Sequence, residues 1–201
     1  SDMPWLKLKS RWVYFAPGGI DFSLLQRLVN FFSRQGTRIA MNPGKAQLAL
    51  GLKRLKPILT KSNVFIVNRE EASRLAGVPY QNEKKIFEAL DRAVAGILVV
   101  TAGVRGAIVS DGASRWRVGV FRERRLVDRT GAGDSFGSGF VAGLMQKPAN
   151  IAYALRLATA NAVSNIDAEL IKLIAQSIND LADEDGWTFL GELGKLLLKK
   201  R

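Results

Sequence analysis

The sequence contains no cysteine and no histidine among its 201 residues. The absence of cysteine excludes a disulfide framework, a thiol nucleophile and a zinc site built on thiolates. The absence of histidine excludes serine–histidine–aspartate catalysis and imidazole general bases, and it removes the commonest metal ligand. Any catalysis must therefore use carboxylates, lysine or arginine side chains, hydroxyl groups and backbone dipoles. Phosphoryl transfer is one chemistry that these groups can support.

The sequence also lacks an apolar run close to the ~20 residues that a membrane span requires, and it does not open on a signal-peptide pattern. We therefore expect a cytoplasmic protein with no membrane partner. Hydrophobic residues make up 47% of the chain, which suits one sizeable core, or one core with a small appendage.

Positive charge is in excess and unevenly distributed, with a formal net charge of +12. Residues 1–66 hold eleven lysines and arginines against two acidic residues, whereas residues 128–201 hold eight against nine. The basic side chains mostly stand singly among apolar ones. This pattern fits a solvated basic surface that also suits anionic nucleotides, and it leaves a nucleic-acid-binding surface open as an alternative.

Short apolar runs alternate with amphipathic segments along most of the chain. Continuous apolar strands between helices are typical of parallel strands that are covered on both faces. We therefore expect a three-layer α/β fold with a largely parallel sheet, followed by a hairpin around Asp111 and Gly112 and by two helices that end near residue 165. The expected strands are 12–16, 38–41, 64–67 and 97–101, and the expected helices are about 22–36, 48–59, 69–77 and 83–95.

A polar, glycine-rich turn precedes the first of these last two helices, with the sequence Asp-Arg-Thr-Gly-Ala-Gly-Asp at 128–134. Gly131 and Gly133 allow a tight bend in which successive backbone N–H groups point at one spot. That spot lies at a helix N-terminus, where the macrodipole also favours negative charge. Asp134 follows in the first helical turn. Its carboxylate is therefore well placed to take a proton from a hydroxyl that attacks a bound phosphate.

The longer stretch 128–140 resembles the D-x-T-G-A-G-D-x-F-x-G-x-F signature of the ribokinase-like (PfkB) sugar and nucleoside kinases. The resemblance implies that Asp134 is the catalytic base. It also implies that the backbone amides of Gly131, Ala132 and Gly133 form the anion hole for the transferred phosphoryl group.

The resemblance implies cation sites in two segments. Asp128 and Thr130 fall where many members of the family hold a monovalent cation such as K⁺, although Arg129 departs from the small polar residue more usual there. Asn68 and Glu71 match the family's N-x-x-E motif, whose carboxylate helps to organise Mg²⁺ and phosphate through water, because Mg²⁺ gives up its hydration reluctantly. The same two residues also predict a helix-capping box. Both roles can hold together, because ligands bind at the carboxyl ends of parallel strands.

Two further segments are candidates for binding the nucleotide. Thr101, Gly103 and Gly106 match the T-x-G-x-x-G motif that the family uses against the nucleotide, and Arg105 is a candidate phosphate contact. A simple β-turn between strands is the alternative interpretation. Asn161 lies on the last helix of the fold, in a region that borders the adenine in the family. Its small neighbours equally predict close packing between helices.

The resemblance to the kinases covers residues 1–165 and implies a domain without the family's N-terminal substrate part and lid. Lids exclude water and complete a site, so we expect transfer to a sugar to be poor without one. Residues 166–201 instead resemble the start of an OST-HTH (LOTUS) domain, a winged-helix module associated with RNA binding, through a D-E-D-G-W turn and an L-G-x-L-G helix. An amphipathic helical extension is the alternative for this segment.

The sequence thus predicts a phosphotransferase that moves the γ-phosphoryl group of ATP to a hydroxyl of a sugar or nucleoside, with Mg²⁺ as a cofactor. The alternative function is RNA or other nucleic-acid binding through the C-terminal segment and the basic surface. A homodimer remains open under either function.

Overall fold

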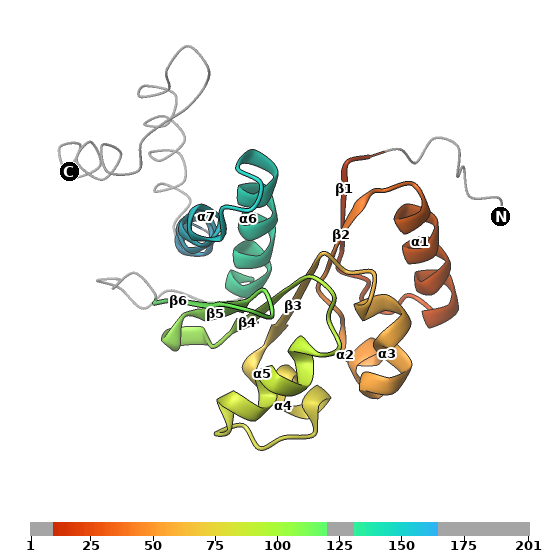
Figure 1. Ribbon diagram of the computed structural model, residues 1–201, viewed down its shortest axis with the longest axis horizontal. Helices are drawn as coiled ribbons and strands as arrows, with labels where there is room; N and C mark the ends of the chain where they lie inside the picture. The colour runs from red at the N-terminus through yellow and green to blue at the C-terminus, as the bar shows by residue number, and fades with distance from the viewer. Residues whose placement is uncertain (1–9, 120–130, 165–201) are drawn as a thin grey trace, which may run out of the picture.

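A six-stranded sheet forms the centre of the molecule, and helices cover both of its faces (Figure 1). The computed structural model describes residues 10–119 and 131–164. The predicted OST-HTH-like segment at 166–201 lies outside the described residues. In chain order the elements are β1 (Trp12–Phe15), α1 (Phe22–Arg34), β2 (Arg38–Met41), α2 (Lys45–Leu48), α3 (Gly51–Leu59), β3 (Val64–Asn68), α4 (Arg69–Ala76), α5 (Glu83–Asp91), β4 (Ile97–Thr101), η2 (Gly103–Arg105), β5 (Ala107–Ser110), β6 (Arg115–Val118), α6 (Ala132–Gln146) and α7 (Ile151–Ser164).

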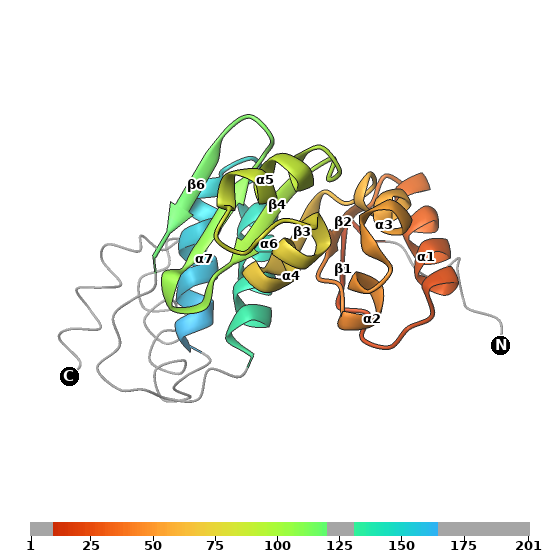
Figure 2. The same ribbon diagram turned by 90° about the horizontal axis from the view of Figure 1, so that it is seen from below.

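The strands follow one another across the sheet in chain order, from β1 at one edge to β6 at the other (Figure 2). Neighbouring strands from β1 to β4 are parallel, and the pairs β4–β5 and β5–β6 are antiparallel. The predicted α/β fold with a largely parallel sheet is therefore confirmed, and the predicted hairpin makes the sheet mixed at one edge. Asn68 at the end of β3 lies opposite Thr101 at the end of β4.

Each strand sends alternate side chains to opposite faces of the sheet, and the two sets form two cores. Ile39 and Met41 belong to the core beneath α1, α3, α4 and α5. Ala40, between them, belongs to the core beneath α6 and α7, together with Ile66. In Figure 1, α6 and α7 lie above the strands, and α4 and α5 lie below them. Burial on both faces explains why the central strands are continuous apolar runs.

Two predicted helices have different bounds in the structure. The segment expected at 48–59 is interrupted between α2 and α3, where Gly51 adopts a left-handed backbone with φ of +74° that a continuous α-helix does not allow. The helix expected at 83–95 ends at Asp91. Beyond it the chain turns toward α3, and the N–H of Ala95 donates to the carbonyl of Leu59 at 3.2 Å. A Cβ on Gly96 would lie 2.2 Å from the Asn63 carbonyl oxygen, so this approach requires glycine.

The helices α6 and α7 pack closely through small residues. A Cβ on Gly143 would lie 2.5 Å from Cα of Ala154, and one on Gly139 would lie 3.0 Å from Cα of Ala158. The prediction of close packing from small residues around Asn161 is therefore confirmed. Within the described part of the chain, no helix is long and apolar enough to cross a bilayer.

Candidate active site

The glycine-rich turn ends at the N-terminus of α6, on the face of the sheet that α6 and α7 cover. Gly131 is the residue before the helix and has φ of +83°, a left-handed conformation that glycine adopts without strain. Phe136 and Phe140 anchor the helix in the core beneath it. Asp134 lies in the first turn, and its side chain is exposed. The segment 120–130, with Asp128 and Thr130, lies outside the described residues.

The first turn of α6 leaves backbone donors and space at the predicted anion hole. The first hydrogen bond of the helix runs from Ser135 N–H to the Gly131 carbonyl at 2.9 Å. The N–H groups of Ala132 and Gly133 precede it, and no acceptor for either lies within residues 10–119 and 131–164. A Cβ on Gly133 would meet no described heavy atom within 4 Å. This end of the helix can therefore accept an anion close to the backbone.

Asn42 contacts the predicted base and was not singled out as a site residue by the sequence. Its side-chain Nδ2 donates to Oδ1 of Asp134 at 2.9 Å, across 92 residues of chain. Its own backbone N–H donates to the Phe15 carbonyl at 2.8 Å, which fixes Asn42 just beyond the end of β2. Asn42 opens an Asn-Pro-Gly sequence directly after the strand expected at 38–41, and such a sequence is typical of the end of a strand. The rule that ligands bind beyond the carboxyl ends of parallel strands could have drawn attention to Asn42.

Tyr14 lies near the same contact, on β1. Its hydroxyl is buried and has no hydrogen-bond partner in the described residues. Burial raises the pKa of Tyr14, the Asn42 side chain lowers it, and the negative charge of Asp134 raises it. The phenol therefore sits close to the Asn42–Asp134 pair.

The predicted capping box at Asn68 is confirmed by two reciprocal hydrogen bonds. The Asn68 side chain accepts from Glu71 N–H at 2.9 Å, and Oε2 of Glu71 accepts from Asn68 N–H at 2.8 Å. Oε1 of Glu71 has no partner among the described residues. Residues 10–119 and 131–164 contain no cluster of three or more side chains suited to hold a metal. One carboxylate that acts with water and phosphates is, however, an arrangement that suits Mg²⁺.

The turn after β4 contains the other predicted nucleotide residues. Thr101 ends β4 directly beside Asn68 of β3. Gly103 and Gly106 have φ of +55° and +81°, and a Cβ on Gly106 would lie 1.9 Å from the Val118 carbonyl oxygen. Gly106 is therefore required by the close approach of β6. A Cβ on Gly103 would meet no described heavy atom within 4 Å, so Gly103 forms the open side of the turn.

A network of arginines positions Arg105 at this turn. The Arg105 guanidinium lies 5.2 Å from the centre of the Tyr80 ring and also donates to the Tyr80 hydroxyl. Buried Arg69 donates to the Tyr80 carbonyl at 3.0 Å and to Glu83 at 2.8 Å. Burial opposes the charge of Glu83, but hydrogen bonds and charges from Arg69 and Arg117 lower its pKa overall. Arg105 is thus held by Tyr80, and the backbone of Tyr80 is held in turn by Arg69.

Asn161 of α7 joins the first turns of α6. Its Nδ2 donates to the Ser135 carbonyl at 2.7 Å, one residue after Asp134. The structure therefore brings Asn161 to the helix that bears the predicted base. It also places Asn42, Asn68 and Thr101 at the carboxyl ends of three adjacent parallel strands, at one edge of the sheet.

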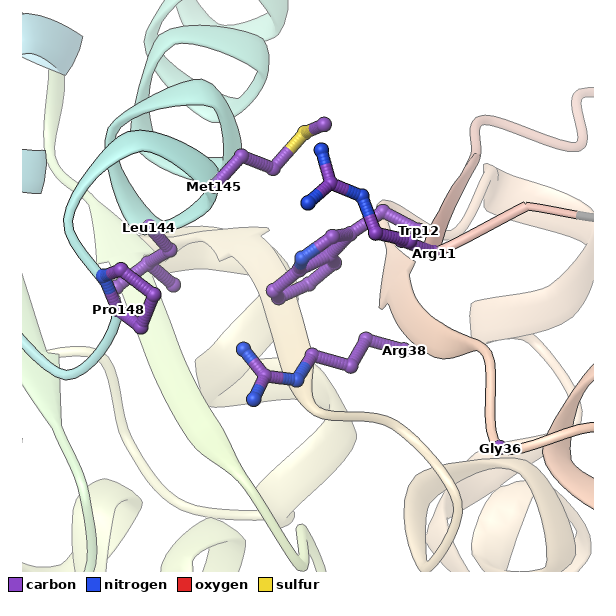
Figure 3. Close-up of a pocket in the computed structure, with 7 residues that line it drawn as sticks. All are labelled: Arg11, Trp12, Gly36, Arg38, Leu144, Met145 and Pro148. Carbon is purple, nitrogen blue, oxygen red and sulfur yellow. The ribbon is translucent and has the colours of Figure 1, made fainter.

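A separate cavity of about 330 Å³ opens at the opposite edge of the sheet (Figure 3). The Arg38 guanidinium lies 5.6 Å from the centre of the Trp12 ring in it. Arg38 begins β2, whereas Asn42 follows its end, so about 13 Å of strand, at ~3.3 Å per residue, separates Arg38 in the cavity from Asn42 at the candidate site. This cavity is therefore not part of the candidate active site. Its lining residues are Arg11, Trp12, Gly36, Arg38, Leu144, Met145 and Pro148.

Known proteins share the sequence and the fold. The model of the pfkB family of carbohydrate kinases matches residues 14–169. An ATP-dependent 6-phosphofructokinase from Thermoanaerobacterium thermosaccharolyticum is 34% identical over 97 residues, which are 48% of this chain and 29% of that protein. A ribokinase from Haemophilus influenzae is 29% identical over 119 residues, which are 57% of this chain and 36% of that protein. The crystal structure of an adenosine kinase from Sinorhizobium meliloti superposes with a TM-score of 0.68 at 23% identity, over 79% of this chain and 49% of that one.

The matched region spans about a third of each of these two curated relatives and about half of the solved adenosine kinase. The similarity to the solved adenosine kinase shows that this chain shares the fold of part of that protein. The family match covers most of the chain, from β1 through the glycine-rich turn and both C-terminal helices. The chain therefore belongs to the pfkB family of carbohydrate kinases.

Proposed function

We propose that this protein transfers the γ-phosphoryl group of ATP to a hydroxyl of a sugar or nucleoside. One observation carries the proposal: the Asp134 carboxylate lies in the first turn of α6, beside backbone amides that have no acceptor in the described residues. Asn42 holds one oxygen of this carboxylate at 2.9 Å. A base beside an anion-binding helix end is the arrangement that phosphoryl transfer to a hydroxyl requires.

In the proposed reaction, Asp134 accepts the proton of the attacking hydroxyl as the new O–P bond forms and the bond to the ADP oxygen breaks. The amides of Gly131, Ala132 and Gly133 donate to the phosphoryl oxygens and stabilise the charge that develops on them. The helix dipole of α6 contributes in the same direction. No imidazole is needed, in agreement with a sequence that contains no histidine.

The nucleotide and its cations would lie along the same edge of the sheet. ATP brings Mg²⁺, for which Glu71, oriented by Asn68, would hold a coordinating water. Thr101 and the turn from Gly103 to Gly106 would border the nucleotide, and Asn161 would approach it from α7. We also propose a monovalent cation at Asp128 and Thr130. This part of the proposal is supported by the sequence motif alone.

The class of acceptor follows from the family and its relatives. The relatives named above include a phosphofructokinase, a ribokinase and an adenosine kinase. The common acceptor group in these names is a hydroxyl on a sugar, free or within a nucleoside. We propose the same acceptor class for this chain.

Binding of MgATP by isothermal titration calorimetry tests the proposal. A Gly133→Val substitution would fill the space beside the backbone amides, where the described structure offers no clash to an added Cβ. The variant should remain folded and lose at least about tenfold in affinity, because charge-assisted hydrogen bonds to phosphate are lost. Ala152→Val, at an exposed position in the first turn of α7, is the matched control and should retain wild-type affinity. If a folded Gly133→Val variant bound MgATP as tightly as the wild-type protein does, the proposed anion hole would be wrong.

A further inference from the structure

Packing in the core does not explain the hydroxyl group of Tyr14. It is buried without a hydrogen-bond partner among the described residues. A buried polar group without a hydrogen-bond partner destabilises the folded protein. Phenylalanine would offer the same ring to the core without this cost. The hydroxyl therefore calls for a role outside packing.

Glycine at position 137 makes room for this hydroxyl. Tyr14 pairs with Ala40 in the parallel β1–β2 ladder, and its side chain packs on the core beneath α6 and α7. A Cβ on Gly137 would lie only 2.7 Å from the Tyr14 hydroxyl oxygen. Gly137 stands three residues after Asp134, so both face the same side of α6. The hydroxyl thus reaches the surface of the helix one turn beyond the carboxylate.

Asn42 completes the arrangement from the neighbouring strand. Its backbone is fixed by the bond to the Phe15 carbonyl, and Pro43 after it favours an extended conformation. From this fixed position, its amide reaches Oδ1 of Asp134 at 2.9 Å. Asn42 and Asp134 both influence the pKa of Tyr14, in opposite directions. The three side chains therefore form one electrostatically coupled group.

We propose that Asn42 and Tyr14 are positioning residues for Asp134. Asn42 occupies one carboxylate oxygen, and the Tyr14 phenol closes the buried side of the pair. The second carboxylate oxygen is left to face the acceptor hydroxyl. The positioning role rests on the proposed function, whereas the coupling of the three side chains does not.

The coupling is tested by NMR on the full chain labelled with [¹³Cζ]tyrosine, since the sequence contains three tyrosines and the signals are few. Asp134→Asn should lower the pKa of Tyr14, because a nearby negative charge is removed. Asn42→Ala should raise it, because the amide that lowers it is removed. The control Tyr153→Phe removes a hydroxyl that bonds to Gln146 on α6, and it should leave the Tyr14 titration unchanged. A Tyr14 pKa that is equal in all of these proteins would overturn the proposal.

Hydrogen exchange of the Asn42 side-chain amide gives a second test, which can be made at neutral pH. The bond to Asp134 should protect one side-chain amide proton of Asn42 from exchange, and Asp134→Ala should abolish this protection. Tyr14→Phe should weaken it. Equal exchange in the wild-type protein and both variants would contradict the arrangement.

Turnover separates the positioning role from a structural one. Asn42→Ala should lower kcat about ten- to hundredfold while KM for ATP changes less than about twofold, because the base is misplaced and the nucleotide site is intact. A parallel rise in KM would instead assign Asn42 to nucleotide binding. If the wild-type protein showed no turnover with any sugar or nucleoside, the proposed function would fail, and the NMR titration would still decide the coupling.

Discussion

Substitution of Gly137 by alanine tests the packing of Tyr14 against α6 without reference to activity. The added Cβ would lie 2.7 Å from the Tyr14 hydroxyl oxygen and 3.1 Å from Cδ1 of Ile66. Ordinary contacts begin at 3.4 Å, so the ring and the helix must separate by roughly 0.7 Å, and the close-packed core resists such a shift. Ile66 ends in a flexible methyl group, and we expect it to yield more easily.

Two opposing effects set the size of the change in stability. Overpacking of a filled core costs about 1–3 kcal/mol. Alanine in place of glycine within a helix returns about 1 kcal/mol. The free energy of unfolding should therefore fall by roughly 0–2 kcal/mol in Gly137→Ala. Removal of the hydroxyl should relieve most of the strain, so the same change in a Tyr14→Phe background should be neutral or stabilising.

Urea denaturation of the four proteins of this double-mutant cycle gives the coupling between the two sites. We expect a coupling of about 1–2 kcal/mol, because the residues are in direct contact. Gly133→Ala in the same helix is the control, since its Cβ would meet no described atom within 4 Å. It should not lower the stability. A coupling indistinguishable from zero would refute the placement of the hydroxyl over Gly137.

Two further predictions concern stability. Gly143→Ala should lower the free energy of unfolding in urea by about 1–3 kcal/mol, because its Cβ would lie 2.5 Å from Cα of Ala154 and backbone cannot yield as a side chain does; an equally stable variant would be inconsistent with this packing. Burial raises the pKa of Tyr14 above its ordinary 10.0, so the folded protein favours the neutral phenol; stability is unaffected below that pH and falls as the pH rises through the folded value. Relative to Tyr14→Phe, wild type should therefore lose stability only above about pH 10 in denaturation series, and a constant difference across the alkaline range would disprove it.

Local patterns predicted most of the fold, because the strands are buried on both faces. Continuous apolar runs such as 64–67 and 97–101 correspond to β3 and β4 almost residue for residue. The capping box at Asn68 was also predictable, because its two hydrogen bonds join residues three apart. The break between α2 and α3 was missed, because the left-handed backbone at Gly51 depends on the surroundings rather than on the pattern.

The candidate site could be predicted only in part, because some of its contacts join distant segments. The turn at 131–134 is a local feature with its own geometry. The contact from Asn42 to Asp134 instead depends on the order of the strands and on where α6 crosses them. The sequence pattern indicates that Asn42 follows the end of a strand. Only the fold shows that its side chain contacts α6. Tyr14 was hidden for the same reason, because a tyrosine in a strand fits an ordinary core position.

The central claim is that Asp134 removes the proton of the acceptor hydroxyl beside phosphate held by the α6 amides. Asp134→Asn keeps the shape of the side chain and removes its capacity to accept the proton. The decisive measurement is ATP-dependent turnover of this variant, together with its affinity for MgATP. The account predicts that kcat falls by about 10²-fold or more while the affinity stays nearly unchanged. Near-normal turnover in the folded variant would contradict it.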